Sequence, residues 1–266
     1  LSLPPDRTGV SPLQASGPVF THLERALSRE YSLRQEDLSD GTVAADADIL
    51  AVIAPRSLGS RALFAIDQFL MRGGTVVLVT APFSASITAG KLQLNTYTSG
   101  LQGWLAHHGI NIEESVVLDS QNASFTVPVT RLAGDYEFQD AELRNYPYFI
   151  DLRPPGLIAH PVTRNLPQLT MPWASPIVAK PAADTQITPL LQSSSDAWLS
   201  SKRGIMPTAG TGGAAHIQPP AGDGKTYTLG LLMNGRFSSF FREGNPGAII
   251  TGDFPSANLL EHPAES

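Results

Sequence analysis

Cysteine is absent from the 266 residues of this chain. Its absence excludes disulfide bonds, thiolate nucleophiles and metal sites built with cysteine ligands. It does not identify the cellular compartment, because cysteine-free proteins occur on both sides of a membrane.

Charge is also scarce, and no run of like charge occurs. Charged residues make up 16% of the chain, below the roughly 25% typical of soluble domains. The 18 basic and 24 acidic residues give a formal net charge of −6. Because no Lys/Arg-rich run is present, the phosphate-neutralising surface of a nucleic-acid-binding protein is missing. We therefore expect no nucleic-acid partner.

Long apolar runs are missing as well. No stretch approaches the roughly 18 consecutive apolar residues of a membrane-spanning helix. The chain begins at Leu1 without the basic and apolar regions of a signal peptide. We expect an excised piece of a longer protein, with any signal or membrane anchor in segments outside the piece.

The composition otherwise fits a folded protein. Hydrophobic residues make up 42% of the chain, which is ordinary for globular proteins and does not favour disorder. The 22 prolines exceed the roughly 13 expected from average usage. This composition predicts long ordered loops around a compact core.

The clearest pattern of elements is a strand, a helix and a strand between residues 47 and 80. The apolar run 47–54 ends at Pro55 and is typical of a strand covered on both faces, as in a parallel sheet. A helix is predicted from Ser60 to about Leu70, and Gly73-Gly74 ends it. A second apolar run, 75–80, follows at once. Together these predict a right-handed βαβ unit.

The alternation of helices and strands continues more weakly on both sides. A helix over 20–31 and a short strand over 31–38 are predicted before this unit, and a helix over 101–108 and a strand over 115–119 after it. This pattern predicts an α/β fold with a doubly wound, mostly parallel sheet and a loop-rich, β-containing C-terminal half. There, 207–224 is interpreted as a loop and 227–233 as a strand.

We expect a single domain over residues 1–266. Its predicted parts are a βαβ core over 1–120, a flap over 121–155 and a loop-rich completion of the sheet over 156–266. The flap contains short β-type runs such as 125–129 and 146–152, which prolines interrupt.

Polar and aromatic side chains follow three of the predicted strands. Arg56 and Ser57 follow the first, Phe83 and Ser84 the second, and Asp119 the third. If these strands are parallel, the loops converge on the rim where open α/β sheets bind ligands. The alternative, which we favour, is that these residues serve only in capping and turn formation.

Aromatic residues gather in the flap. The stretch 136–143 interleaves acids with aromatics, and Tyr146, Tyr148 and Phe149 follow. Aromatic faces beside carboxylates are suited to binding a sugar or a peptide. The alternative, again favoured, is a solvated flap that covers the sheet.

Reactive motifs are not complete anywhere in the chain. The sequence of residues 222–226, GDGKT, resembles the end of a phosphate-binding loop, but Pro219 stands where the first glycine belongs and no strand precedes it. His107 and His108 are neighbours on a predicted helix and point roughly 100° apart, which does not suit one metal ion. No serine nucleophile elbow and no nucleophile–base pair are present. We expect no enzymatic activity, no cofactor and no metal.

Three segments together carry a family resemblance. The first, 47–83, contains in order Pro55, Ser60, the motif of 66–69 (IDQF), the motif of 72–74 (RGG) and Pro82. The others are 160–176, from HPVT to WASP, and 229–241, LGLLMNGRFSSFF. In this order they resemble the auxiliary component of ABC-type transport systems of the gliding-motility (GldG-like) type. Ala81 departs from the Asp-Pro that members often have at 81–82.

The resemblance implies a domain on the periplasmic or extracytoplasmic face of the cytoplasmic membrane. It would lie between membrane segments and work beside an ABC permease and a separate ATPase subunit. The implied fold is related to flavodoxin-like and glutamine-amidotransferase-like domains, although the cysteine nucleophile of the latter is absent here.

The leading hypothesis is therefore a non-catalytic accessory domain of an ABC-type transport system. It would contact partner subunits, or a transported polymer or glycan, through the sheet-end loops and the flap. Two alternatives remain open at this stage: a carbohydrate- or peptide-binding module that uses the flap, and a degenerate α/β hydrolase around Asp119.

Overall fold

The computed structural model describes residues 1–2, 20–88, 91–134, 136–207, 217, 219, 222, 224–242 and 260. Strands hold 41% of the described residues and helices 14%. The elements, in chain order, are α1 (Thr21–Leu27), the 3-10 helix η1 (Leu38–Asp40), β1 (Ile49–Ile53), α2 (Ser60–Met71), β2 (Thr75–Val79), β3 (Phe83–Thr88), β4 (Lys91–Thr96), α3 (Gln102–His107), β5 (Ile110–Ile112), β6 (Val116–Leu118), β7 (Asn122–Ala133), β8 (Tyr136–Leu152), β9 (Leu169–Pro172), β10 (Ile177–Ala179), β11 (Thr185–Gln192), β12 (Trp198–Ser200) and β13 (Thr228–Gly235).

The predicted doubly wound, mostly parallel sheet is wrong, and with it the flavodoxin-like and glutamine-amidotransferase-like fold. The described strands form six small sheets, and among their strand pairs only β1–β2 is parallel. The run 115–119 shows why the prediction failed. It forms β6, which is buried throughout, but it pairs antiparallel with β12. A short apolar run indicates burial and does not indicate the direction of its neighbour.

The predicted βαβ unit is confirmed. β1 and β2 pair in parallel from Ile49 opposite Thr75 to Ile53 opposite Val79, and α2 connects them. α2 ends at a glycine pair that no other residue type could replace without strain. Gly73 has a φ of +87°, and a Cβ on Gly74 would lie 2.4 Å from the ring of Phe69.

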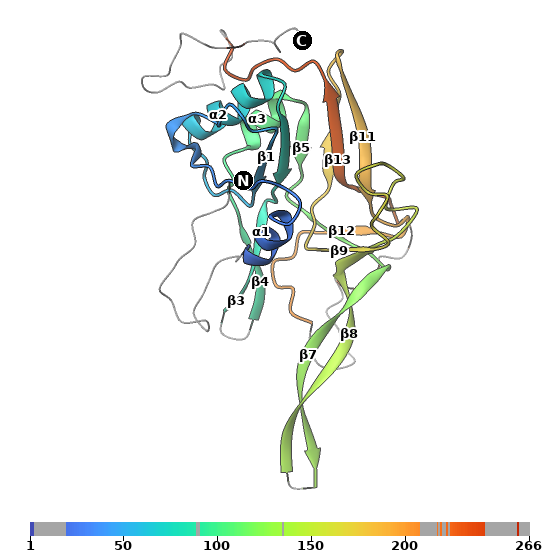
Figure 1. Cartoon of the computed structure of the whole chain (residues 1–266). Helices are drawn as coiled ribbons and strands as arrows, with labels where there is room; N and C mark the ends of the chain where they lie inside the picture. The colour runs from blue at the N-terminus through green and yellow to red at the C-terminus, as the bar shows by residue number, and fades with distance from the viewer. Residues whose placement is uncertain are drawn as a thin grey trace.

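The β1–β2 sheet is covered on one face only in the described part of the chain. Leu50 and Val52 are buried in the core with residues of α2 and α3; Figure 1 shows these two helices beside the sheet. On the opposite face Ile49, Val77 and Val79 remain 51%, 44% and 53% exposed. The prediction that both strands are covered on both faces is therefore wrong.

A buried carboxylate joins the helical side of the molecule. The side chain of Asp67, on α2, is fully buried and accepts hydrogen bonds from Trp104 Nε1 of α3 at 3.0 Å, Ser239 Oγ at 2.5 Å and the backbone N–H of Phe240 at 2.9 Å. Two helices and the segment after β13 therefore meet at one group. We refer to Asp67 and these three donors as the Asp67 knot.

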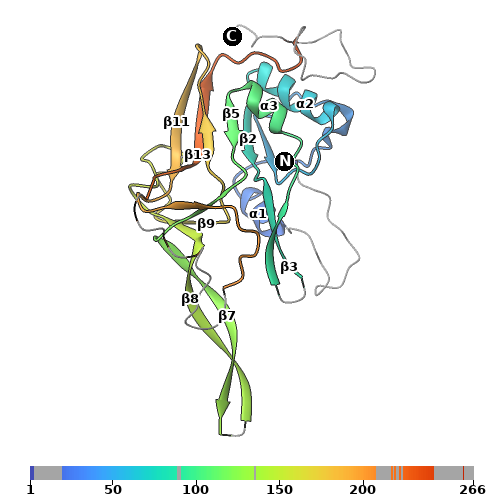
Figure 2. The ribbon, with the colours of Figure 1, turned by 180° about the vertical axis from the view of Figure 1, so that it is seen from behind.

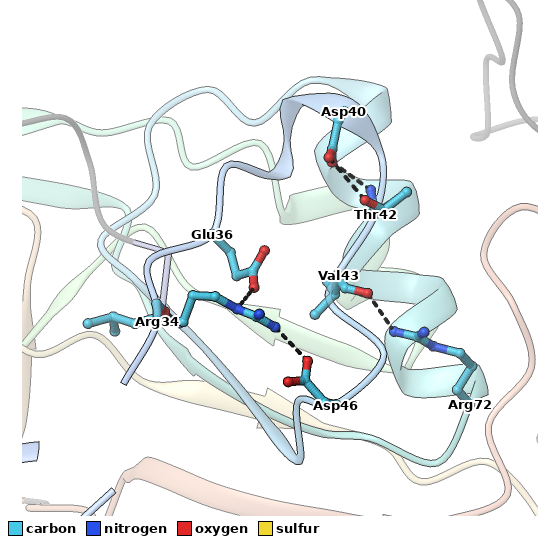
Figure 3. A network of polar contacts seen from close by, with 8 residues as sticks. Arg34, Glu36, Asp40, Thr42, Val43, Asp46 and Arg72 are labelled. Carbon is cyan, nitrogen blue, oxygen red and sulfur yellow. Dashed lines mark hydrogen bonds and ion pairs between the residues drawn. The ribbon is translucent and has the colours of Figure 1, made fainter. Parts of the chain in front are cut away.

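An exposed polar network holds the loop between α1 and β1. The guanidinium of Arg34 donates to Glu36 at 2.8 Å and to Asp46 at 2.7 Å, and Arg72 donates to the carbonyl of Val43 at 3.1 Å (Figure 3). The hydrogen bond from Arg34 lowers the pKa of Asp46 below its ordinary value. Because these pairs face solvent, each contributes little to stability, and their role is to shape the loop.

The predicted strand over 31–38 is absent from this loop. Residues 32–37 have no regular structure, and η1 follows them, where Asp37 accepts a hydrogen bond from the backbone N–H of Ser39 and Gly41 adopts a φ of +83°. Asp40 accepts two further hydrogen bonds from Thr42. Short acidic side chains that bind the nearby backbone favour turns over strands.

The predicted helix over 20–31 is present as α1 but buries none of its residues, and the helix over 101–108 is present as α3. The predicted strand over 227–233 is β13, which pairs antiparallel with β11. Most of the loop predicted over 207–224 lies outside the described residues.

Two hairpins extend from the body of the molecule. β3–β4 and β7–β8 point toward the same end in both Figure 1 and Figure 2, and β7–β8 reaches farther. In the half of the β3–β4 hairpin nearer its turn, the segment 203–205 adds to β4 through hydrogen bonds from Leu94 N–H to the carbonyl of Arg203 and from Ile205 N–H to the carbonyl of Leu92.

We predict that the Asp67 knot is a main source of stability. Asp67→Asn places an amide N–H₂ among donors, so the free energy of unfolding should fall by about 2–4 kcal/mol in chemical denaturation. Asp48→Asn, at an exposed position before β1, should change it by less than about 0.5 kcal/mol. Equal effects of the two substitutions would contradict this assignment.

Candidate functional site

The outer part of the β7–β8 hairpin projects from the body of the molecule and is exposed to solvent (Figure 1). Its strands pair in register from Phe125 opposite Arg144 to Ala133 opposite Tyr136. β9 joins β8 only at 149–152, so no third strand described in the structure covers the outer part. We call the part over 125–144 the arm and the part of β8 over 146–152 the root.

The root is anchored in the core. Tyr146 and Tyr148 are fully buried, and burial raises the pKa of both hydroxyls above the ordinary value. The hydroxyl of Tyr146 donates to the carbonyl of Ile205 at 2.8 Å, and its ring lies 5.0 Å from that of Phe125 and 4.9 Å from that of Phe149. The two tyrosines that the sequence suggested as stacking faces therefore fix the arm to the body.

The arm itself exposes large apolar side chains. Tyr136 is 81% exposed, Leu132 71%, Leu143 70% and Phe138 46%. Tyr136 and Phe138 alternate with the neighbouring β8 residues and share one face of the hairpin, while the register places Leu132 and Leu143 on the other. A cluster of exposed apolar side chains on a projecting element is typical of a protein-binding surface.

Ion pairs neutralise part of the charge on the arm. Arg131 Nε lies 2.6 Å from Asp140, and Arg144 Nε lies 3.0 Å from Glu142. The backbone N–H of Ala141, followed by Arg131, lowers the pKa of Asp140. Residues 122–145 contain four acidic residues and two arginines, so this part of the sequence carries a net charge of −2.

The residues predicted at strand ends do not form one rim. Arg56 and Ser57 follow β1, and Phe83 and Ser84 follow its parallel neighbour β2, so these two groups lie near each other. Tyr97 links them, because its hydroxyl donates to the carbonyls of Ala54 and Pro55 and its backbone N–H to the carbonyl of Pro82. Asp119 follows β6, which lies in a different sheet.

Arg56 and Ser57 lie on an exposed and tightly held loop. Ala54 and Ser57 have φ values of 45° and 47°, which non-glycine residues rarely adopt. The hydroxyl of Tyr97 donates to the carbonyls of Ala54 and Pro55, and the guanidinium of Arg56 lies 5.3 Å from the centre of the Tyr97 ring. Tyr97 therefore holds the strained turn in place.

Phe83 and Ser84 lie at the start of the shorter hairpin. Phe83 is buried in the second core cluster, and Arg203 covers its ring with its guanidinium carbon 3.8 Å from the ring centre. Ser84 is partly buried within β3. Both positions support the packing of the hairpin.

Asp119 forms a second buried polar centre. Its carboxylate is fully buried and accepts hydrogen bonds from the backbone N–H of Ser194 at 2.7 Å, from Ser194 Oγ at 2.6 Å and from the backbone N–H of Gln121 at 2.8 Å. Sequence reasoning missed Ser194 as its partner. The sequence holds no signal for this contact, since the two residues are 75 positions apart.

An open hollow of about 290 Å³ lies beside this centre and is lined by Ser120, Asp196, Trp198, Pro219, Gly222 and Gly224. Within the described residues, the indole Nε1 of Trp198 has no hydrogen-bond partner. Among the described residues that line it, the hollow has one carboxylate side chain, that of Asp196, and no basic side chain.

The histidine pair of α3 serves in packing. The rings of His107 and His108 lie 5.0 Å apart at 81°, and His107 Nε2 lies 2.9 Å from the carbonyl of Ser238. Burial, and then the charge of His107, lowers the pKa of His108 to about 4. No group of three or more His, Cys, Asp or Glu residues in the described part of the chain could hold a metal ion. Nor does any described helix combine the length and apolar character required to cross a bilayer.

Comparison with known proteins gives one match. The sequence model of a protein family described as an ABC-type uncharacterized transport system matches residues 17–260. No curated protein and no solved structure matches the chain.

We predict a pH dependence of stability from His108. Its pKa is near 6.5 in the unfolded chain and about 4 in the folded one. The contribution of neutral His108 to the free energy of unfolding is therefore fully present above pH 6.5 and is lost as the pH falls toward 4. Chemical denaturation at pH 7 and at pH 4 measures this loss. Between these two pH values the free energy of unfolding of His108→Leu should fall less than that of the wild type, by on the order of 2–3 kcal/mol. His22→Leu, at an exposed position, should follow the wild-type profile, and identical profiles for both variants would contradict the prediction.

We also predict a large difference between root and arm tyrosines. Tyr146→Phe leaves the carbonyl of Ile205 without its donor and should lower the free energy of unfolding by about 1–2 kcal/mol. Tyr136→Phe removes a hydroxyl from an 81% exposed side chain and should have almost no effect. Chemical denaturation of both variants compares the two sites, and a destabilised Tyr136→Phe would show that the arm tip is packed in solution.

Proposed function

Because the chain belongs to the family of the ABC-type uncharacterized transport system, as an auxiliary component, we propose that it is a docking domain whose arm binds another subunit of the system. The observation that carries this proposal is the exposure of Leu132, Tyr136, Phe138 and Leu143 on an element that projects from the body. The proposed role is non-catalytic.

The energetics of the arm favour a partner. Burial of apolar surface contributes roughly 25 cal/mol per Å², and large aromatic and aliphatic side chains supply most of the binding energy in protein interfaces. Here four such side chains gather within twelve residues of sequence. Two ion pairs already fix Arg131 and Arg144, so the arm loses less conformational entropy when it binds than a flexible loop would.

The proposed partner is the permease, with ATP hydrolysis in a separate subunit. No complete phosphate-binding loop occurs in the sequence, which is consistent with this division of roles. We place the domain on the periplasmic or extracytoplasmic face of the membrane, as the family resemblance implies. Membership of the gliding-motility type stays a prediction, as does a role of Arg56 and Ser57 as a further contact.

The alternatives have less support. Sugar or peptide stacking was suggested by Tyr146 and Tyr148, whose rings are buried in the root. A hydrolase around Asp119 would require a reactive carboxylate, but hydrogen bonds from Ser194 occupy both of its oxygens. The docking function is therefore the one that we propose.

The test is removal of the arm from the full-length protein. In the register of the hairpin Val127 lies opposite Glu142, so residues 128–141 can be replaced by Asn-Gly, which closes a short hairpin. This variant should still unfold cooperatively. When it is co-expressed with the permease and ATPase of its own system, the amount of permease that co-purifies with it should be at least about tenfold lower than with the wild type.

Val162→Ser serves as the control, because it changes an apolar side chain that is 64% exposed outside the arm. It should leave co-purification unchanged. Undiminished recovery of the permease by the arm-shortened variant would refute the proposed function.

A further inference from the structure

We infer that the arm inserts into a cleft of its partner subunit that closes over both faces of the hairpin, and that this cleft has apolar walls and a basic rim. This inference rests on the proposed function and specifies how the arm binds. Three observations carry it: apolar exposure on both faces, blocked backbone edges, and an acidic charge without a partner near the tip.

The apolar side chains are divided between the faces. Leu132 lies opposite Glu137 and shares its face with Leu143, whereas Tyr136 and Phe138 lie on the other face. Tyr136 and Leu132, one on each face near the turn, are the two most exposed of the four, at 81% and 71%. A flat partner surface could cover only one of these faces. A cleft covers both.

The backbone edges of the arm are unsuited to adding a strand. The N–H of Ala141 donates to the carboxylate of Asp140 at 2.8 Å, so it faces away from β7. Ala141 lies opposite Pro128, and the two members of an antiparallel pair point their backbone groups the same way, either into the ladder or outward. At position 128 the outer edge of β7 therefore offers no donor, because proline has no N–H.

Both edges are thus interrupted at the same level of the arm. On β8 the outward donor of Ala141 is already occupied, and on β7 the donor is absent. Proline and charged side chains are common means of preventing edge-to-edge association of strands. At this level of the arm a partner meets side chains and no free backbone donor, which favours a cleft over an added strand.

The charge of the arm defines the rim of the cleft. Arg131 with Asp140 and Arg144 with Glu142 form ion pairs, whereas exposed Glu137 forms none with any residue that the structure describes. Residues 122–145 carry a net charge of −2. The arm is therefore complementary to a cleft that has Lys or Arg at the rim of its apolar walls.

The experiment compares paired variants of the full-length protein, with the purified permease of its own system in lipid nanodiscs as the probe. One variant carries Leu132→Ser and Leu143→Ser, and a second carries Tyr136→Ser and Phe138→Ser. Insertion predicts that each variant alone weakens binding at least about tenfold, because each removes the contacts of one wall. Val162→Ser is the control for loss of an exposed apolar side chain.

Two further variants test the edge and the charge. Pro128→Thr restores a backbone donor and should change the affinity less than about twofold, since the edge is not used. Glu137→Lys should weaken binding several-fold, and the loss should shrink as salt rises from 0.05 to about 0.5 M. Unfolding curves that match the wild type confirm that each variant is folded.

The outcomes separate the two proposals. If only one of the paired variants weakens binding, the partner is flat: insertion is overturned and the docking function stands. If neither does, the arm is not the docking element and both proposals fail. Tighter binding by Pro128→Thr would indicate strand addition and would also overturn insertion.

Discussion

The helical side of the structure depends on the burial of one carboxylate, that of Asp67. A buried charge is tolerated only when donors surround it, and Trp104, Ser239 and Phe240 supply them from elements remote in sequence. The packing of α2 on α3 and the path of the chain after β13 follow from this requirement. Two of the three segments that carry the family resemblance, 47–83 and 229–241, meet at Asp67.

The local elements could be predicted from the sequence, but their pairing could not. The βαβ unit was predicted because strand, helix and glycine stop follow one another within a short distance, and its strands are parallel as expected. β6 was recognised as a buried strand, but its neighbour β12 runs antiparallel and lies far along the chain, with Leu118 paired to Trp198, 80 residues farther on. Hydrophobic periodicity reports burial at each position and carries no information about distant partners.

The sequence showed that aromatic residues gather in the β7–β8 hairpin, but it did not show which of them are exposed. Tyr146 and Tyr148 were recognised as aromatic residues of a flap, yet they are buried, and the exposed residues are Tyr136 and Phe138 in the same segment. Composition does not distinguish an aromatic side chain in the root from one in the arm. That distinction depends on where β8 leaves the body, which is fixed by contacts with Ile205 and other distant residues.

The unbroken course of β8 sets how far the arm reaches from the body. The strand passes from buried Tyr146 to exposed Tyr136 without interruption, and ten residues of strand span about 30 Å. Contact with a neighbour therefore needs no approach of the body itself. If the arm docks as proposed, the body can stand clear of the partner and remain attached through a narrow hairpin, and a shift of the partner is passed to the body through the buried root.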